Sequence, residues 1–511
     1  TTTQQINDLV ELNRLVRTVN QTSVDMCKKF QERENKCIEL AQLNQAIPMM
    51  QNASGVDGAC IDNVQMQSML EDFTNQIMLC KNDIQAIEES INKYWAFVRA
   101  RLLEAVNHLK TDGIPRIKIL KQQWMDGVQA KASGLFQLDT SLKTFEDITH
   151  RTCLVLLQLI NITNRLLRYM PNNDITQIKT ESSRLLQCLV TNCLMVEHQP
   201  SQVIKTNAKF SATLRLSVGT ALQLQQISPK VRAILINEEQ LMRLKQNDAT
   251  GDYDAFVHNF NDSRAGDLLS SEGNLEIAPG SVNALVATLS NLKLNRINRS
   301  PDKRDASLEE KFCLFFCTDF TVQVQEEQLR MVAWAASLPV VVVVHDLQKC
   351  QAEGPILWDN AFHLTQRSGF EVRHEVTWNE LETALAHKFI EMTRVGDRFL
   401  GLNAYQLNYL KQKLFSVASQ TDSEPVVTYK MLLKDNLPGK SFTLWKWFWK
   451  AAKSIKDDMC EEWIDGLIHG FMSKSEVERL LHANGQLNTF LIRFVDSQKG
   501  QICVHYLVSL S

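Results

Sequence analysis

The chain has 511 residues, 44% of them hydrophobic and 22% charged, with a formal net charge of −3 at pH 7. This length predicts several globular domains, and the slightly acidic balance excludes a protein that binds nucleic acid through bulk positive charge alone. The 12 cysteines form no paired framework, which favours a reducing compartment. The longest apolar run, 338–344, is too short to cross a bilayer, so no membrane insertion is expected.

Residues 1–194 are predicted to be almost entirely helical. An apolar stripe from Phe73 to Leu109 advances in steps of three and four residues, as in a coiled coil. The expected breaks lie at Pro48–Gly58, at Gly113–Pro115 (a kink rather than an end), at Ser133-Gly134 and at 171–173, with the last helix ending near Met195. Long helices with short connections predict an antiparallel four-helix bundle, whose core would contain the stripe.

Short runs rich in β-branched and aromatic residues follow, and they predict a β-sandwich over 195–356. The expected strands are 208–218, 231–236, 284–289, 312–324 and 338–344. Clusters of Gly, Asp and Asn at 247–252 and 259–267 are interpreted as turns. Cys313 and Cys317 have no second pair at metal spacing and are interpreted as core residues, so neither a metal site nor a cofactor is predicted.

Two windows in the sandwich region contain basic residues and no acid. The first lies between Glu197 and Glu238, and the second lies between Glu276 and Asp302. Their basic residues are Lys205, Lys209, Arg215, Lys230, Arg232, Lys293, Arg296 and Arg299, and Lys303 and Arg304 follow. In a net-acidic chain such windows are typical of phosphate contact, although solvated basic loops remain an alternative of similar weight.

Helical patterns return over 357–465, with amphipathic segments at 378–392, 403–417 and 441–455. The last of them carries a dense aromatic group, Trp445, Trp447, Phe448 and Trp449. These residues could form an aromatic ligand box. At helical spacing, packing between domains is the more frequent role, and we prefer that interpretation.

Near the end of the chain, the strand-like run 489–494 places Arg493 among apolar residues, where a charge requires a partner. A capping-box spacing at 473–476 opens a helix before it, and a turn at 496–500 leads to alternating apolar residues at 502–508. This order resembles the first half of a phosphotyrosine-binding SH2 domain, whose arginine forks onto two phosphate oxygens. The alternative for Arg493 is a surface salt bridge with its charge in water.

The segments 445–449, 463–474 and 488–494 closely resemble the linker-to-SH2 junction of the STAT family of transcription factors. Two further segments, 203–210 and 337–342, are similar to the family's DNA-approaching strand and loop and to the strand before its groove-reading loop. The resemblance implies a multidomain α+β protein. Its expected parts are a four-helix coiled-coil bundle (1–194), an immunoglobulin-like DNA-binding domain (195–356), a helical linker (357–465) and the amino-terminal half of an SH2 domain (466–511).

The resemblance also implies site residues. The residues expected to bind phosphotyrosine are Arg493, Lys474, Ser497 and Asp496, and Val495 stands where the family usually has serine. The residues expected to bind DNA are Lys205, Thr206, Asn207, Lys209, Lys303, Arg304, His345 and Gln348. His345 stands where asparagine is common and presents different donors, so the base preference is expected to differ. Asp346 is expected to repel phosphate unless it turns away.

The sequence contains no glycine-rich phosphate loop, nucleophile elbow or metal-spaced histidine pair, so no enzyme is expected. The resemblance implies a phosphotyrosine-regulated transcription factor that dimerises through reciprocal SH2–phosphotyrosine contacts and binds double-stranded DNA. Its further partners would be a tyrosine kinase or phosphorylated receptor, and it would move from cytoplasm to nucleus on phosphorylation. The alternative is an SH2-containing adaptor that binds phosphopeptides without DNA; a purely structural helical protein is disfavoured by the SH2-like motif.

Overall fold

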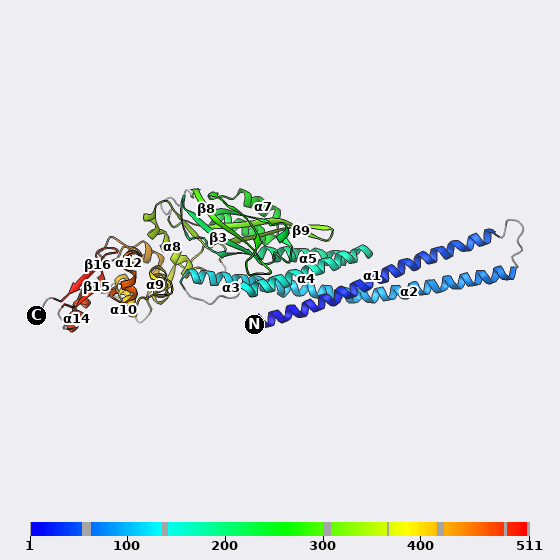
Figure 1. Cartoon of the computed structure of the whole chain (residues 1–511), viewed down its shortest axis with the longest axis horizontal. Coiled ribbons are helices and arrows are strands. Elements are labelled where there is room, and N and C mark those ends of the chain that lie inside the picture. Colours follow the sequence, from blue (N-terminus) through cyan, green and yellow to red (C-terminus); the bar gives the residue numbers. More distant parts are fainter. Residues whose placement is uncertain are drawn as a thin grey trace.

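The structure is a computed structural model that describes residues 2–53, 63–134, 142–299, 308–364, 367–415, 424–484 and 488–507. Figure 1 shows its parts in a row: a long helical region, a β-sandwich packed along it, a second helical part and a small C-terminal sheet. This is the predicted multidomain α+β architecture. The predicted domain boundaries stay predictions, and the one at 356/357 falls inside a helix.

The first part contains α1 (Thr2–Ala53), α2 (Asn63–His108), α3 (Ile114–Ala132), α4 (Leu142–Tyr169) and α5 (Asn173–Asn192). A π-helical turn, Leu109–Gly113, joins α2 to α3, which confirms the predicted kink, and α3 ends before Ser133-Gly134 as expected. The predicted separation of the first two helices is confirmed, but α1 continues through Pro48 to Ala53, so the break starts later than expected. A helix of 52 residues paired with α2 tolerates one missing backbone hydrogen bond.

The bundle is built around the predicted stripe, with Val98, Leu102 and Ala105 of α2 fully buried. Beyond the ends of α4 and α5, α1 and α2 continue as a two-helix arm (Figure 1). The fourth helix ends at Asn192 rather than near Met195, because the apolar residues that follow pair as a strand with the sandwich.

The sandwich strands are β1 (Leu194–His198), β2 (Val203–Lys205), β3 (Lys209–Leu216), β4 (Lys230–Asn237), β5 (Gly266–Leu269), β6 (Glu272–Asn274), β7 (Glu276–Ile277), β8 (Leu285–Ile297), β9 (Lys311–Val324), β10 (Glu327–Ala336) and β11 (Val340–Val343). One sheet has the order β1-β3-β8-β5, with β7 beside β8. The other has the order β2-β11-β9-β4-β6, with β10 beside β9. The predicted strands are thereby confirmed in two sheets.

Turns remain at Gly251-Asp252 and at 263–265, so the predicted turns are present but shorter than expected, because two helices extend into the clusters at 247–252 and 259–267. These helices are α6 (Glu238–Thr250) and α7 (Tyr253–Asp262). Asn237 caps the first in a capping box, and Asp252 caps the second. Asn and Asp favour helix starts as much as turns, and the buried Phe256 and Phe260, one helical turn apart, anchor α7 on the sheet.

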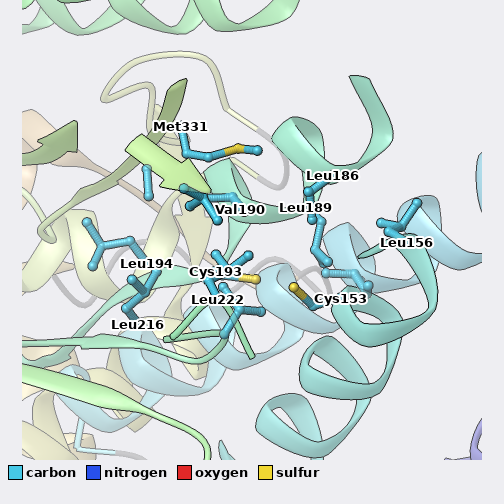
Figure 2. Close-up of a cluster of buried hydrophobic side chains, with 14 of the residues drawn as sticks. Cys153, Leu156, Leu186, Leu189, Val190, Cys193, Leu194, Leu216, Leu222 and Met331 are labelled. Carbon is cyan, nitrogen blue, oxygen red and sulfur yellow. The ribbon is translucent and has the colours of Figure 1, made fainter. Parts of the chain in front are cut away.

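The bundle and the sandwich share one core. Figure 2 shows Cys153, Leu156, Leu186, Leu189 and Val190 of the bundle helices beside Leu194, Leu216, Leu222 and Met331 of the sandwich. A buried hydrogen bond, from Thr149 Oγ1 to Ser217 Oγ at 2.9 Å, crosses the same boundary. Close-packed cores resist relative motion, so these two parts form one rigid body. Every cysteine that the structure describes is free.

The second helical part contains α8 (Lys349–Phe362), β12 (Glu375–Thr377), α9 (Trp378–Thr393), α10 (Ala404–Leu414), β13 (Val426–Thr428), α11 (Tyr429–Leu433), α12 (Leu444–Asp458) and α13 (Cys460–Ile464). The three predicted helices are confirmed as α9, α10 and α12. The aromatic group of α12 is buried, and Trp447 Nε1 donates to the carbonyl of Val495 at 3.0 Å. The group therefore packs between domains, as predicted.

The C-terminal part contains β14 (Ile468–Gly470), α14 (Lys474–Asn484), β15 (Phe490–Phe494) and β16 (Ile502–Tyr506), and β15 is the central strand of the sheet. The helix predicted to open at 473–476 is confirmed as α14, which packs through Val477 and Leu481 against Leu491 of β15. Val504 and Tyr506 of β16 are 49% and 68% exposed, so their alternation faces outward. In the described ranges, no helix is long and apolar enough to span a bilayer.

Candidate functional site

The first candidate site is built around Arg493 on the central strand of the C-terminal sheet. β15 pairs in parallel with β14 and antiparallel with β16, which places Arg493 opposite Cys503. The arginine side chain is only 8% exposed. A charged group at this depth is stable only with polar partners, and the neighbouring segments supply them.

Most of the guanidinium of Arg493 is already bound. Its Nη1 donates to Asp496 Oδ1 at 3.0 Å and to the carbonyls of Phe494 and Met472 at 2.9 and 3.3 Å. Its Nε donates to Nε2 of His505 at 3.1 Å. Nη2 makes no hydrogen bond to any described residue. One end of the guanidinium is therefore held in place, while the other is available to an acceptor.

Asp496 is itself held by the linker helix α10. It accepts hydrogen bonds from the Tyr409 hydroxyl at 2.6 Å and from Lys413 Nζ at 2.9 Å. Burial, with the carboxylate beside it, raises the pKa of Tyr409, so the phenol stays a donor at any physiological pH. Two cations, Arg493 and Lys413, thus share one carboxylate, which leaves the pocket positively charged.

The other predicted phosphotyrosine-binding residues do not contact Arg493. Lys474 is exposed and lies 3.6 Å from Glu478 in an ion pair, and Ser497 is exposed on the turn after β15. His505, which sequence reasoning missed, is the nearer partner. Burial lowers its pKa, and Arg493 and then Lys474 among its neighbours act in the same direction, so the imidazole is neutral and accepts from the guanidinium.

The second candidate site lies at one end of the sandwich, where three segments converge. β2 pairs in parallel with β11, which sets Lys205 opposite Val343, and the Thr206 amide donates to the Val343 carbonyl at 2.9 Å. Asn207 has φ 63°, a left-handed conformation that asparagine tolerates. Its amide donates to the carbonyl of Leu294 on β8 at 2.8 Å.

Positive charge gathers at this end. Lys209 and Lys293 are directly opposite each other on β3 and β8, an arrangement that is destabilising unless an anion lies between them. Asp346 forms ion pairs with Lys205 and, at 2.9 Å, with Lys349, and these hydrogen bonds lower its pKa to about 2. The expected repulsion of phosphate by Asp346 is therefore offset by two lysines.

The loop after β11 has a defined shape. Gln348 Oε1 accepts hydrogen bonds from the amides of Val344 and His345 at 2.8 and 3.0 Å, so this side chain holds the loop instead of projecting from it. His345 is exposed, and Leu347 is 90% exposed. Sequence reasoning missed Leu347; an apolar residue inside a polar loop was the available signal.

Of the other basic residues in the two windows and just after them, two lie outside the described residues and two face inward. Lys303 and Arg304 lie outside the described residues. Arg215 is buried in ion pairs with Glu146 and Glu197, and Arg299 donates to the Val342 carbonyl at 2.8 Å. These two arginines face inward, so the interpretation of the windows as phosphate contacts is too broad: burial, not sequence position, decides which cations can reach a ligand.

Comparisons with known proteins agree with this division of the chain. A family model described as the STAT protein DNA-binding domain matches residues 198–343, one for the signal transducer and activator of transcription linker domain matches 365–448, and one for the SH2 domain matches 467–509. Proteins named signal transducer and transcription activator are similar as well. The one from Anopheles gambiae is 32% identical over 339 residues, which cover 66% of this chain and 44% of the relative. The one from Drosophila melanogaster is 32% identical over 336 residues, covering 65% and 42%. The chain thus spans less than half the length of these relatives.

Proposed function

Because this chain belongs to the STAT family, we propose that it is a transcription factor whose binding to specific double-stranded DNA is controlled by phosphotyrosine. The observation that carries the proposal is the buried guanidinium of Arg493, whose Nε and Nη1 are hydrogen-bonded and whose Nη2 has no hydrogen-bond partner among the described residues. The lysine-rich end of the sandwich, with an ordered loop between its basic segments, supports the DNA-binding part.

The first requirement for phosphotyrosine binding is a positively charged pocket. Arg493, Lys413 and Lys474 surround two carboxylates, Asp496 and Glu478, so the pocket has an excess of one positive charge before a ligand enters. A phosphate dianion would be bound by Nη2 of Arg493, with Lys474 turning from its exposed partner toward the ligand. Asp496 orients the guanidinium and does not itself bind phosphate, since two anions repel.

Two such pockets would act together. If a phosphorylated tyrosine of one copy enters the Arg493 pocket of a second copy, and the reverse contact forms as well, a two-fold symmetric dimer results. The second contact is intramolecular, so two weak sites give a strong complex. An upstream tyrosine kinase or phosphorylated receptor would supply the signal, and the dimer would move from the cytoplasm to the nucleus.

On DNA, the segments that converge at the end of the sandwich would make two kinds of contact. Lys205, Thr206, Lys209 and Lys293 are placed to contact backbone phosphates, which position a protein without reading sequence. The loop after β11 presents His345 to base edges and Leu347 to a thymine methyl group, the two kinds of contact that specify bases in a major groove.

Gln348→Ala is expected to weaken binding to the specific DNA site about fivefold, because a lost loop hydrogen bond is worth about 1 kcal/mol and frees the loop from its reading position. Binding to a scrambled DNA of equal length should not change. Fluorescence anisotropy with both DNAs measures this difference, and Gln328→Ala, an exposed glutamine on β10, is the control. Equal losses on both DNAs would contradict the assigned role of Gln348.

Tyr409→Phe is expected to weaken phosphotyrosyl-peptide binding roughly threefold to tenfold, because hydrogen bonds to charged groups contribute about 1.5–3 kcal/mol and only part of this loss reaches Arg493 through Asp496. Isothermal titration calorimetry measures the affinity. Tyr94→Phe, in the distant helical arm, is the control and should bind as the unmodified chain does. An unchanged affinity in Tyr409→Phe would show that α10 does not brace the pocket.

The alternative is an adaptor that binds phosphopeptides without DNA. A gel-shift titration against salt, with and without tyrosine phosphorylation, separates the two functions. A transcription factor is retained on its specific DNA only when phosphorylated, and its affinity falls steeply with salt. An adaptor binds the phosphopeptide and shows no specific DNA retention under either condition, and this result would reject the proposed function.

A further inference from the structure

A cavity of about 440 Å³ lies where the bundle, the sandwich and the linker meet. Its walls come from α3, from α6 and β10 of the sandwich, and from the segment that follows α8. Ligand pockets in proteins commonly measure about 300–1,000 Å³, so the space suits a small molecule. The polar residues that decide its chemistry are Lys118, Lys121, Lys245, Asp248, Trp334 and Arg367.

The cations of this cavity lack sufficient counter-charge. Arg367 is neutralised by the fully buried Asp359, at 2.7 and 3.0 Å. Lys118, Lys121 and Lys245 form no ion pair with a described carboxylate. Lys245 Nζ donates to the Ser368 carbonyl at 2.7 Å, and Lys121 Nζ lies 5.5 Å from the centre of the Trp334 ring. Among the described lining residues, Asp248 supplies the carboxylate, one against three lysines.

The pKa shifts of these groups also indicate that they are buried without enough opposite charge. Burial lowers the pKa of Lys121 to about 8 and lowers that of Lys245, and it raises the pKa of Asp248. Each shift means that burial in the cavity wall disfavours the charged form. The indole Nε1–H of Trp334 is buried beside the Asp248 carboxyl, and this contact opposes part of the rise in the pKa of Asp248. Buried charges such as these are costly unless a partner satisfies them.

We propose that this cavity binds a small phosphomonoester, with the phosphate between Lys118, Lys121 and Lys245. Three ammonium groups against one carboxylate match a dianion rather than a single carboxylate ligand. The volume exceeds the needs of inorganic phosphate, and the apolar walls, which include Met125, Leu241 and Phe370, would contact the organic part. A ligand there touches three parts of the protein at once and would hold them together. This site is separate from the Arg493 pocket and does not depend on it.

The experiment uses butyl phosphate and inorganic phosphate as probes, titrated by calorimetry into the full chain carrying Arg493→Ala, which removes the other candidate phosphate pocket. Butyl phosphate should bind at one site per chain and more tightly than inorganic phosphate. Lys121→Gln and Lys245→Gln should each weaken it at least tenfold. Lys230→Gln, an exposed lysine paired with Glu272, should leave it unchanged. No saturable binding, or binding in both cavity variants that is as tight as in the chain with Arg493→Ala alone, would overturn the proposal.

A pH series provides a second measurement that does not need a charge-removing variant. The phosphomonoester is a dianion above about pH 7, whereas Lys121 loses its proton near pH 8. Affinity should therefore be highest near pH 7 and fall as pH rises through 8 to 9.5, while below pH 7 the ligand itself loses its second negative charge. Lys118, Lys245, Asp248, Arg367 and His363 also line the cavity. In Lys121→Arg the charge is permanent, so the fall should be much smaller; the same fall in both proteins would overturn the proposal.

Discussion

Arg493→Ala is expected to weaken binding of a phosphotyrosyl peptide at least about 100-fold, which corresponds to about 3 kcal/mol or more. The guanidinium is the buried group that would bind the phosphate through Nη2, and each of its charge-assisted hydrogen bonds would be stronger than a neutral one. The substitution also leaves Asp496 paired with Lys413 alone, so the excess positive charge that would attract phosphate is lost.

Arg493→Lys tests whether geometry or charge alone is responsible. A lysine keeps the positive charge but lacks the planar guanidinium that can donate two parallel hydrogen bonds, so it should restore little of the affinity. Arg479→Ala is the matched control, because this arginine lies on the neighbouring helix α14, is exposed and pairs with Glu476. Calorimetry with phosphorylated and unphosphorylated peptides measures all three variants. Comparable losses in Arg479→Ala and Arg493→Ala would mean that general surface charge, not the pocket, attracts the peptide.

The double variant Lys205→Ala, Lys209→Ala is expected to weaken binding to specific and scrambled DNA alike, by roughly tenfold or more at low salt. Each lysine lost should lower the slope of log affinity against log salt by about 0.9, because one counterion fewer is released. Both lysines lie at the basic end of the sandwich, because Lys205 ends β2, which pairs with β11, and Lys209 begins β3, which pairs with β8.

Lys230→Ala is the control for this effect. The lysine lies on the same sandwich, yet the register of β4 on β9 places it at the opposite end from the loop after β11. Its slope should equal that of the unmodified chain. If the double variant kept the original slope, or if Lys230→Ala lost as much, the basic end of the sandwich would not be the DNA-binding surface.

The sequence was sufficient to predict an element where a run of apolar residues shows directly that it is buried. An arginine within Phe490–Phe494 predicts a central strand with a charge inside it, and the structure has that strand. It was insufficient for the partners of this arginine. His505 lies on β16 among apolar residues that alternate, and their outward orientation follows from strand pairing that the sequence does not display. The linker residues Tyr409 and Lys413 are distant in the chain and reach Asp496 only in the folded protein.

The DNA-facing end shows the same limit. The sequence identifies Lys205, His345 and Gln348 as polar residues in loops, but it does not reveal that Gln348 is used to hold the loop. It also counts Arg215 with the surface lysines, although two glutamates hold it inside the protein. Side-chain hydrogen bonds between distant segments decide both cases, and composition windows contain no information about them.

The most direct test of the account is nuclear magnetic resonance of the chain with ¹⁵N-labelled arginine side chains, with Arg493→Lys used to assign the resonance of Arg493. Titration with a phosphotyrosyl peptide should shift the Arg493 Nε–H resonance in proportion to peptide bound, while Arg479 stays unchanged. A peptide that binds fully by calorimetry without moving this resonance would contradict the claim that Arg493 recognises the phosphate.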